Sequence, residues 1–227
     1  MPRTFITRFL GLAIVLALAG QSTRADDPRQ AAGDKVTPAE ALQKLKDGNA
    51  RFIAQKTTAK NDAARRAETA KGQKPFAIIL ACADSRVGPE IVFDQSLGDL
   101  FVIRVAGNVT DPSILGSIEY AVLHIGTPLV VVMGHEKCGA VAAVLEGGKA
   151  EGNLAELLKE VHVGDPKGSL AANVKDNAKF HADAMLKQSK TINDMVKSGR
   201  VQIVTSYYDL SAGTIEWLGS PEVKKGK

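Results

Sequence analysis

The chain has 227 residues, of which 44% are hydrophobic and 24% are charged, a composition typical of a globular protein and not of a disordered one. This length is enough to bury a core within one domain. The formal net charge of +4 depends on Arg3, Arg8 and Arg24, because residues 1–25 contain no acidic side chain. The rest of the chain is close to neutral, at about +1, so neither a nucleic acid nor an anionic membrane is expected as a partner.

The first 25 residues have the pattern of a secretory signal peptide. Arg3 and Arg8 precede an uncharged, mostly apolar run from Phe9 to Gly20, and Thr23-Arg24-Ala25 offers a cleavage site before Asp26. The apolar run is shorter than the ~20 residues that a membrane-spanning helix needs, and an uncleaved anchor is the alternative. We therefore expect residues 1–25 to be removed, the protein to be exported to a bacterial periplasm, and no membrane contact after cleavage.

Residues 26–36 are polar and contain proline and glycine, which predicts a flexible arm. A helix follows at Thr37-Pro38-Ala39-Glu40, which combines an N-cap threonine, a proline in the first turn and the glutamate of a capping box. Apolar residues then recur at helical spacing as far as Ile53. The next stretch, residues 57–72, is rich in alanine and in charged residues, and it predicts a solvated helix.

The remainder of the chain alternates strands with helices, which predicts parallel strands joined by right-handed crossovers. Apolar runs of strand character lie at residues 76–81, 100–105, 128–134 and 200–208, with a short edge strand at 214–218. Helical patterns lie at residues 111–125, 138–145, 154–160, 170–188 and 192–197. We predict one α/β domain over residues 37–220 and a polar tail at 221–227. Its mostly parallel central sheet has about four strands plus an edge strand, flanked by helices, with an N-terminal helical arm.

Two of these strands end in residues that bind metal ions. Cys82 follows the first strand, and His135 and Cys138 follow the third, where sites form at the carboxyl edge of a parallel sheet. Two thiolates and one imidazole favour zinc in a tetrahedral site with one open position. A disulfide between the two cysteines is the alternative, because cysteines in an exported protein often pair.

Asp84 and Arg86 follow closely after Cys82. Two thiolate ligands neutralise the charge of Zn²⁺, which makes the metal a weaker acid toward its bound water. An acceptor that orients the resulting hydroxide would therefore be useful, and Asp84 is placed to be that acceptor. A bidentate pair with Arg86 would keep the carboxylate off the metal, whereas a plain structural ion pair is the alternative reading.

The chain resembles the β-class carbonic anhydrases from about Val36 to Leu218. The matching stretches are Cys82–Val87, Phe93–Gln95, Gly98–Val102, Arg104–Asn108, Gly116–Ala121, Gly134–Val141 and Tyr207–Leu210. The resemblance implies one zinc ion per subunit, held by Cys82, His135 and Cys138. It also implies reversible hydration of carbon dioxide to bicarbonate and a proton by zinc-bound hydroxide, which the dyad of Asp84 and Arg86 orients.

The resemblance further assigns a substrate cleft. Gln73 is expected to donate a hydrogen bond to a substrate oxygen, with the backbone N–H of Gly139 nearby. Phe101, Ala106 and Tyr120 are expected to line a small apolar cleft, which suits an uncharged substrate. In the family this cleft lies at a dimer interface and the N-terminal helix embraces the partner subunit, so a homodimer or homotetramer is expected.

One departure from the family pattern concerns regulation. Some members bind bicarbonate beside a tryptophan three residues before the first cysteine, and their aspartate then ligates zinc. Ile79 occupies that position here, although Arg104 and Tyr208 match the other residues of that bicarbonate site. We therefore predict an open zinc site at neutral pH, without the bicarbonate switch.

Other functions remain compatible with these residues. The same site could act on carbon disulfide or carbonyl sulfide, or a zinc ion or disulfide could be structural in a protein that is not an enzyme. His181 falls at helical spacing with apolar residues, which favours a packed side chain over a ligand. His124 and His162 receive no role.

Overall fold

The computed structural model describes residues 36–222. The predicted signal peptide, residues 26–35 of the predicted arm and residues 223–227 of the predicted tail lie outside the described residues. Between residues 36 and 222, no helix is both long enough and apolar enough to cross a membrane.

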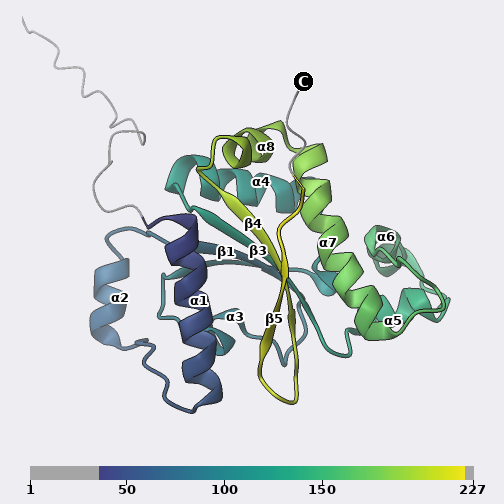
Figure 1. Ribbon diagram of the computed structural model, residues 1–227, viewed down its shortest axis with the longest axis horizontal. Helices are drawn as coiled ribbons and strands as arrows, with labels where there is room; N and C mark the ends of the chain where they lie inside the picture. The colour runs from purple at the N-terminus through teal and green to yellow at the C-terminus, as the bar shows by residue number, and fades with distance from the viewer. Residues whose placement is uncertain (1–35, 223–227) are drawn as a thin grey trace, which may run out of the picture.

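The protein is built around one five-stranded sheet with the strand order β2-β1-β3-β4-β5 (Figure 1). The first four strands in this order are parallel, and only β5 runs antiparallel to its neighbour β4. This arrangement confirms the predicted α/β class and the predicted edge strand. The strands are β1 (Ala77–Ala81), β2 (Leu100–Arg104), β3 (Leu129–His135), β4 (Gln202–Tyr208) and β5 (Ile215–Gly219).

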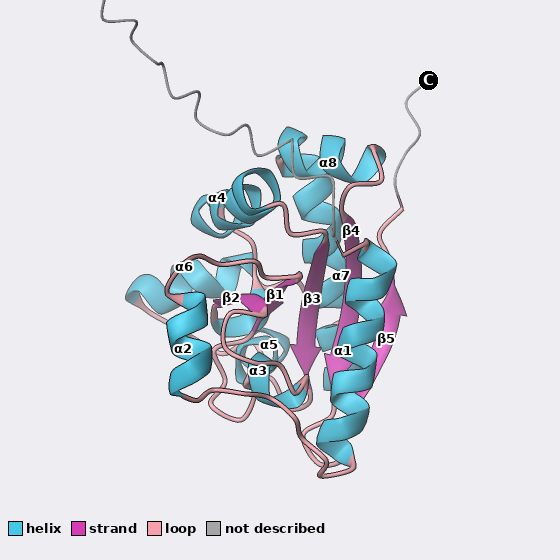
Figure 2. Ribbon diagram, turned by 90° about the vertical axis from the view of Figure 1, so that its left-hand side faces the viewer, coloured by secondary structure: helices cyan, strands magenta, loops and turns pink. Residues whose placement is uncertain are grey.

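Helices cover both faces of the sheet, which explains why β1 is apolar at every position and β3 is apolar from Leu129 to Met133. Successive side chains of a strand point to opposite faces. Ile78 and Leu80 pack with one set of helices, whereas Ile79 and Ala81 pack with the other. The first set is α4 (Pro112–Tyr120), α7 (Leu170–Gln188) and α8 (Lys190–Lys197), and the second is α1 (Pro38–Ile53) and α3 (Pro89–Val92). Figure 2 shows α1 and α7 on opposite sides of the sheet.

Helix α1 begins with the predicted capping box between Thr37 and Glu40. The apolar face of α1, on which Ala41 and Leu45 are fully buried, packs against α3 and the sheet of the same subunit. The side chain of Asn49 adds a hydrogen bond to the Val92 carbonyl at 2.9 Å. A contact between α1 and a partner subunit, as the resemblance implies, would therefore have to use the opposite, polar face of the helix.

The prediction of one helix over residues 57–72 is wrong for its first half. Only α2 (Ala63–Thr69) is helical, starting after its N-cap Asp62. The preceding segment is instead held by the buried carboxylate of Asp94, which accepts hydrogen bonds from the backbone N–H groups of Thr58 and Ala59, each at 2.9 Å. Asp94 also pairs with Arg51. These partners lie more than 30 residues away in sequence, so the local helical pattern could not reveal them.

The other predicted helices are present with small shifts at their ends. The helix predicted over residues 111–125 is α-helical as far as Tyr120 and finishes as a π-helical turn, η2 (Ala121–Ile125). The helices that follow β3 are α5 (Gly139–Leu145) and α6 (Gly152–Glu160), and α7 has the predicted bounds. A short 3-10 turn, η1 (Ala106–Asn108), follows β2. Because β1 and β3 are parallel neighbours, their carboxyl ends bring Cys82 and His135 to the same edge of the sheet.

Candidate metal centre

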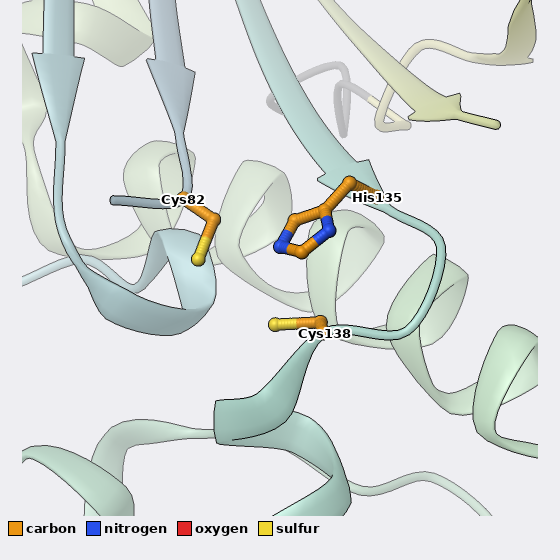
Figure 3. Close-up of side chains that lie close together, drawn as sticks. All are labelled: Cys82, His135 and Cys138. Atoms are coloured by element: carbon orange, nitrogen blue, oxygen red, sulfur yellow. The ribbon is translucent and has the colours of Figure 1, made fainter. Parts of the chain in front are cut away.

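The three predicted metal ligands converge at this carboxyl edge. Cys82 follows β1, His135 is the last residue of β3, and Cys138 is the residue before α5 (Figure 3). The chain returns Cys138 toward the site through a tight turn, in which Lys137 has a positive φ of 55°. The two Sγ atoms and a ring nitrogen of His135 lie within 4.8 Å of one another, and all three residues are buried.

The orientation of His135 leaves one ring nitrogen facing the two thiols. Its Nδ1 lies 2.8 Å from the carbonyl oxygen of Glu136, so Nδ1 carries the proton and donates it there. The other nitrogen, Nε2, is then an acceptor, and it is buried without a hydrogen-bond partner. A buried lone pair without a partner costs free energy, and a metal ion bound at Nε2 would remove that cost.

The two cysteines are free thiols in the structure, so the alternative of a disulfide is wrong. Without a metal ion, the Cys138 thiol hydrogen-bonds to Cys82 and lowers the pKa of Cys82 to about 4. The same contact raises the pKa of Cys138. The pair therefore holds one negative charge, and a divalent cation that replaces the shared proton would stabilise both thiolates. Two thiolates and one imidazole are a donor set that fits zinc with a fourth position open.

Asp84 and Arg86 form the predicted bidentate pair beside these ligands. Arg86 Nε donates to Asp84 Oδ1 at 2.9 Å, and Arg86 Nη2 donates to Asp84 Oδ2 at 2.7 Å. The backbone N–H of Arg86 also donates to Oδ1, at 2.9 Å. The guanidinium group holds the pKa of the Asp84 carboxyl well below its usual range. Asp84 Oδ2 lies 3.9 Å from His135 Nε2, so the carboxylate borders the metal position while remaining tied to Arg86.

The sequence containing these residues matches a known family. A family model described as carbonic anhydrase matches residues 77–215, a segment that includes all three ligands. This chain belongs to the carbonic anhydrase family. A carbonic anhydrase 2 of Mycobacterium tuberculosis is 39% identical over 189 residues, which cover 78% of this chain and 91% of the relative. A carbonic anhydrase of Mycolicibacterium smegmatis is 40% identical over 190 residues, which cover 79% of this chain and 92% of the relative.

Solved structures place this carbonic anhydrase in the β class. One of two tetrameric β-carbonic anhydrases of Sordaria macrospora superimposes with a TM-score of 0.57 at 28% identity, covering 68% of this chain and 85% of its own. The β-carbonic anhydrase CafA of Aspergillus fumigatus superimposes with a TM-score of 0.59 at 26% identity. The match covers 81% of this chain and 91% of the CafA chain. Enzymes of this class use zinc, and the Cys82, His135 and Cys138 cluster is the site in this chain that fits it.

The structure of this carbonic anhydrase separates the predicted substrate residues into two groups. Ala106 and Gly139 lie beside the metal ligands, at the start of η1 and of α5. Gln73 is exposed and precedes β1, whose five residues extend over about 16 Å before Cys82 is reached. Phe101 pairs with Ile78, four residues before Cys82.

Tyr120 lies with Phe101 and not with the metal ligands. The centroids of the Phe101 and Tyr120 rings are 6.5 Å apart, and the Tyr120 side chain is half exposed. Both residues belong to the side of the molecule formed by β2, which is the terminal strand of the sheet. A single subunit therefore does not bring Gln73, Phe101 and Tyr120 to its own metal centre.

Contacts around the ligands involve residues to which the sequence analysis gave no such role. Arg104 Nε donates to the carbonyl oxygen of Cys82 at 3.0 Å, and Arg104 Nη2 donates to that of Asp84 at 2.6 Å. The backbone N–H of Gly107 donates to Cys82 Sγ at 3.4 Å. Arg104, the last residue of β2, and Gly107 stand in the family-like stretch Arg104–Asn108, which is the one sequence signal that could have pointed to these contacts.

His181 is packed, as the helical pattern predicted. It is 1% exposed, and its Nδ1 accepts a hydrogen bond from the backbone N–H of Thr110 at 3.1 Å. Burial lowers the pKa of His181 to about 4, so the ring is neutral near pH 7. His162 stacks on Phe180 with a centroid distance of 4.2 Å, outside the metal cluster.

Proposed function

We propose that this protein catalyses the reversible hydration of carbon dioxide to bicarbonate and a proton, with Asp84 and Arg86 as its catalytic dyad. The observation that supports the dyad is the bidentate contact of Arg86 with a carboxylate that borders three buried metal ligands. Zinc bound to these ligands would supply a Lewis acid that makes a water molecule nucleophilic at neutral pH. The chain's own residues then position that nucleophile and the substrate.

Asp84 is suited to be a hydrogen-bond acceptor only. Its pKa is held low, so the carboxylate carries no proton that it could donate at neutral pH. A water molecule in the open position would direct its hydrogen toward Asp84 and its lone pair away from it, toward a substrate carbon. The side chain of Asp84 is mostly buried, whereas Arg86 is half exposed, so the pair lies at the mouth of the site.

The same arrangement argues against a purely structural zinc site. Structural sites are closed by four protein ligands. Within the described part of the chain, one cluster of three candidate ligands is found here, and the carboxylate of Asp84, 3.9 Å from His135 Nε2, is occupied by Arg86. A position is thus left for water or substrate, as catalysis requires.

We further propose that the fourth position stays open at neutral pH. Arg104, which matches part of the family's bicarbonate site, is already bonded to the carbonyl groups of Cys82 and Asp84. Ile79 and Tyr208 are buried in the apolar cluster against α1. Arg86 competes with the metal for Asp84, and no tryptophan is present at residue 79 to form the bicarbonate site.

The active unit that we propose is a homodimer or a homotetramer. Phe101 and Tyr120 are partly exposed or exposed on the β2 side, Gln73 is exposed before the amino end of β1, and all three are remote from the metal ligands of their own subunit. A second subunit packed against this side would bring these residues to its metal centre. In that arrangement, Gln73 of the partner subunit donates to a substrate oxygen held over the zinc of the first.

We also propose that the enzyme is exported and acts in a bacterial periplasm, on the pattern of residues 1–25. Amino-terminal sequencing of the protein from a periplasmic fraction should begin at Asp26. Recovery of the chain with Met1 intact would contradict export by cleavage.

The choice between substrates is tested by comparing their turnover. The zinc-loaded protein should hydrate carbon dioxide in a stopped-flow assay far faster than it consumes carbon disulfide or carbonyl sulfide at equal concentration. If the protein consumes carbon disulfide or carbonyl sulfide faster than carbon dioxide, the site is assigned to that substrate instead. No turnover of any of the three by the zinc-loaded protein would overturn the proposed function.

A further inference from the structure

A chain of hydrogen bonds joins the metal ligand Cys82 to the middle of α7. The N–H of Gly107 donates to Cys82 Sγ at 3.4 Å, and the carbonyl oxygen of Gly107 accepts a hydrogen bond from Asn177 Nδ2 at 2.7 Å. Asn177 Oδ1 in turn accepts from the backbone N–H of His162 at 2.9 Å. One buried amide side chain thus links the turn beside the metal centre to the segment that precedes α7.

The side chain of Asn177 is held in one orientation by its burial and its hydrogen bonds. It is 0% exposed, and both its donor and its acceptor are engaged. Among the described residues, only Asn177 and Cys82 make side-chain hydrogen bonds to the backbone of this turn. The next residue, Asn108, is fully buried and its side-chain nitrogen and oxygen have no hydrogen-bond partner.

The position of Gly107 is sensitive to small movements. Its φ of 72° is a conformation that L-amino acids rarely adopt, and a Cβ at this residue would lie 3.0 Å from Val161 Cγ2 and 3.3 Å from Ala140 Cβ. The bond from the Gly107 N–H to Cys82 Sγ, at 3.4 Å, has a length that is normal for a sulfur acceptor, so its strength depends on where the N–H points. A rotation of the backbone at Gly107 that follows a shift of its carbonyl group would therefore weaken the bond.

We propose that Asn177 is a positioning residue of the zinc site. By holding the Gly107 carbonyl, Asn177 aims the Gly107 N–H at Cys82 Sγ, where the N–H dipole stabilises the negative charge of the thiolate and fixes its direction toward the metal. Hydrogen bonds to a ligand from outside the coordination shell commonly change metal affinity 10- to 100-fold. The inference rests on zinc binding at the site and not on the identity of the substrate.

Asn173 provides a matched control on the same helix. It is also 0% exposed, and its side chain donates to the Asp165 carbonyl at 2.8 Å and accepts from the Asp165 N–H at 3.1 Å. It therefore ties a loop to α7 as Asn177 does, without a contact to Gly107 or to a metal ligand. A loss of fold stability should appear in both N177L and N173L, whereas an effect on the metal should appear only in N177L.

The experiment measures zinc affinity by competition with a chelator, at a temperature where both apoproteins are folded. N177L should bind zinc about 10- to 100-fold more weakly than the wild type, whereas N173L should stay within about threefold. With Co²⁺ in place of zinc, the thiolate-to-metal absorption of N177L should move to lower energy, because the sulfur loses a hydrogen bond. The band of N173L should not move.

Equal zinc affinities and equal Co²⁺ spectra in N177L and the wild type would overturn the inference. A loss of zinc affinity that is equal in N177L and N173L would also overturn it. If N177L does not fold, Asn177→Ala serves in its place with the same expected direction and the same contradicting result. Wild-type protein that binds no zinc would overturn the proposed function together with this inference. Zinc-binding wild type with an unaffected N177L would overturn the inference alone.

Discussion

Arg86 contacts both carboxylate oxygens of Asp84, with donor–acceptor distances of 2.9 Å to Oδ1 and 2.7 Å to Oδ2. This contact decides what Asp84 can do beside a zinc ion. A free carboxylate at this place would be a fourth ligand, whereas one engaged by a guanidinium group remains an acceptor for a water molecule. The two residues of the pair are therefore expected to act separately, Asp84 as the acceptor for a water molecule and Arg86 as the group that keeps Asp84 off the metal.

Asp84→Asn should lower the rate of carbon dioxide hydration on the order of 100-fold. A carboxylate can only accept a hydrogen bond from the nucleophile, whereas the amide can also donate one through its NH₂ group, so it no longer fixes the orientation of the nucleophile. Zinc content should remain that of the wild type. Asp194→Asn is a suitable control, since Asp194 also pairs with a neighbouring basic side chain, Lys190, but lies on the surface. Turnover by D84N close to that of D194N would rule out the proposed role.

Arg86→Ala should convert the open site into a closed one. Without the guanidinium group the Asp84 carboxylate is free to bind zinc, so a crystal structure of the zinc-loaded variant at pH 7.5 should show Asp84 coordinated. The wild type at the same pH should show a water molecule in that position and Asp84 on Arg86. Coordination of zinc by Asp84 in the wild type would refute the proposed open state.

Gln73→Ala and D84N should complement each other if the cleft is shared between subunits. In a mixed dimer, one site would combine the intact Asp84 of the Q73A chain with Gln73 of the partner subunit, and would work normally. Co-expressed chains, purified through two different tags, should therefore be more active than either parent. Activity no higher than the mean of the two parents would show that Gln73 acts within its own subunit or not at all.

His181 should make stability depend on pH between about 6.5, the usual histidine pKa, and its lowered pKa of about 4. Within this window the unfolded chain binds a proton and the folded chain does not, so the free energy of unfolding falls as pH falls. His181→Asn, which keeps an acceptor for the Thr110 N–H, should reduce this loss by up to about 3 kcal/mol. Urea unfolding of the metal-free wild type and variant from pH 7.5 to 4.5 measures the free energy of unfolding of each. If this free energy falls equally with pH in both proteins, His181 is not buried as a neutral ring.

The elements of this fold were predictable where the governing pattern is local. The capping box at Thr37 and the apolar spacing over residues 170–188 act within a few residues, and both correctly located a helix. The runs that end at Cys82 and His135 predicted strands, and because parallel strands share a carboxyl edge they also predicted that these ligands meet.

What the sequence could not reveal depends on contacts between distant residues. Asp94 holds a segment 36 residues earlier, and this contact replaced half of the helix expected over residues 57–72. Asn177 lies 70 residues from Gly107, on a helix whose polar residues look like those of any solvated face. The separation of Gln73 from Cys82, in contrast, is already implied by the strand predicted over residues 76–81, which lies between them, and it points to a second subunit.

The central claim, that zinc at Cys82, His135 and Cys138 drives carbon dioxide hydration, is tested by measuring zinc content and stopped-flow hydration on the same samples. We expect one zinc ion per subunit in the active protein. Removal of zinc by a chelator should abolish activity and release two titratable thiols, and restoring zinc should restore activity. Cys138→Ser should have neither full zinc content nor activity. Hydration that persists in the metal-free protein, or a fully zinc-loaded protein without hydration, would show that zinc at these three residues does not drive the reaction.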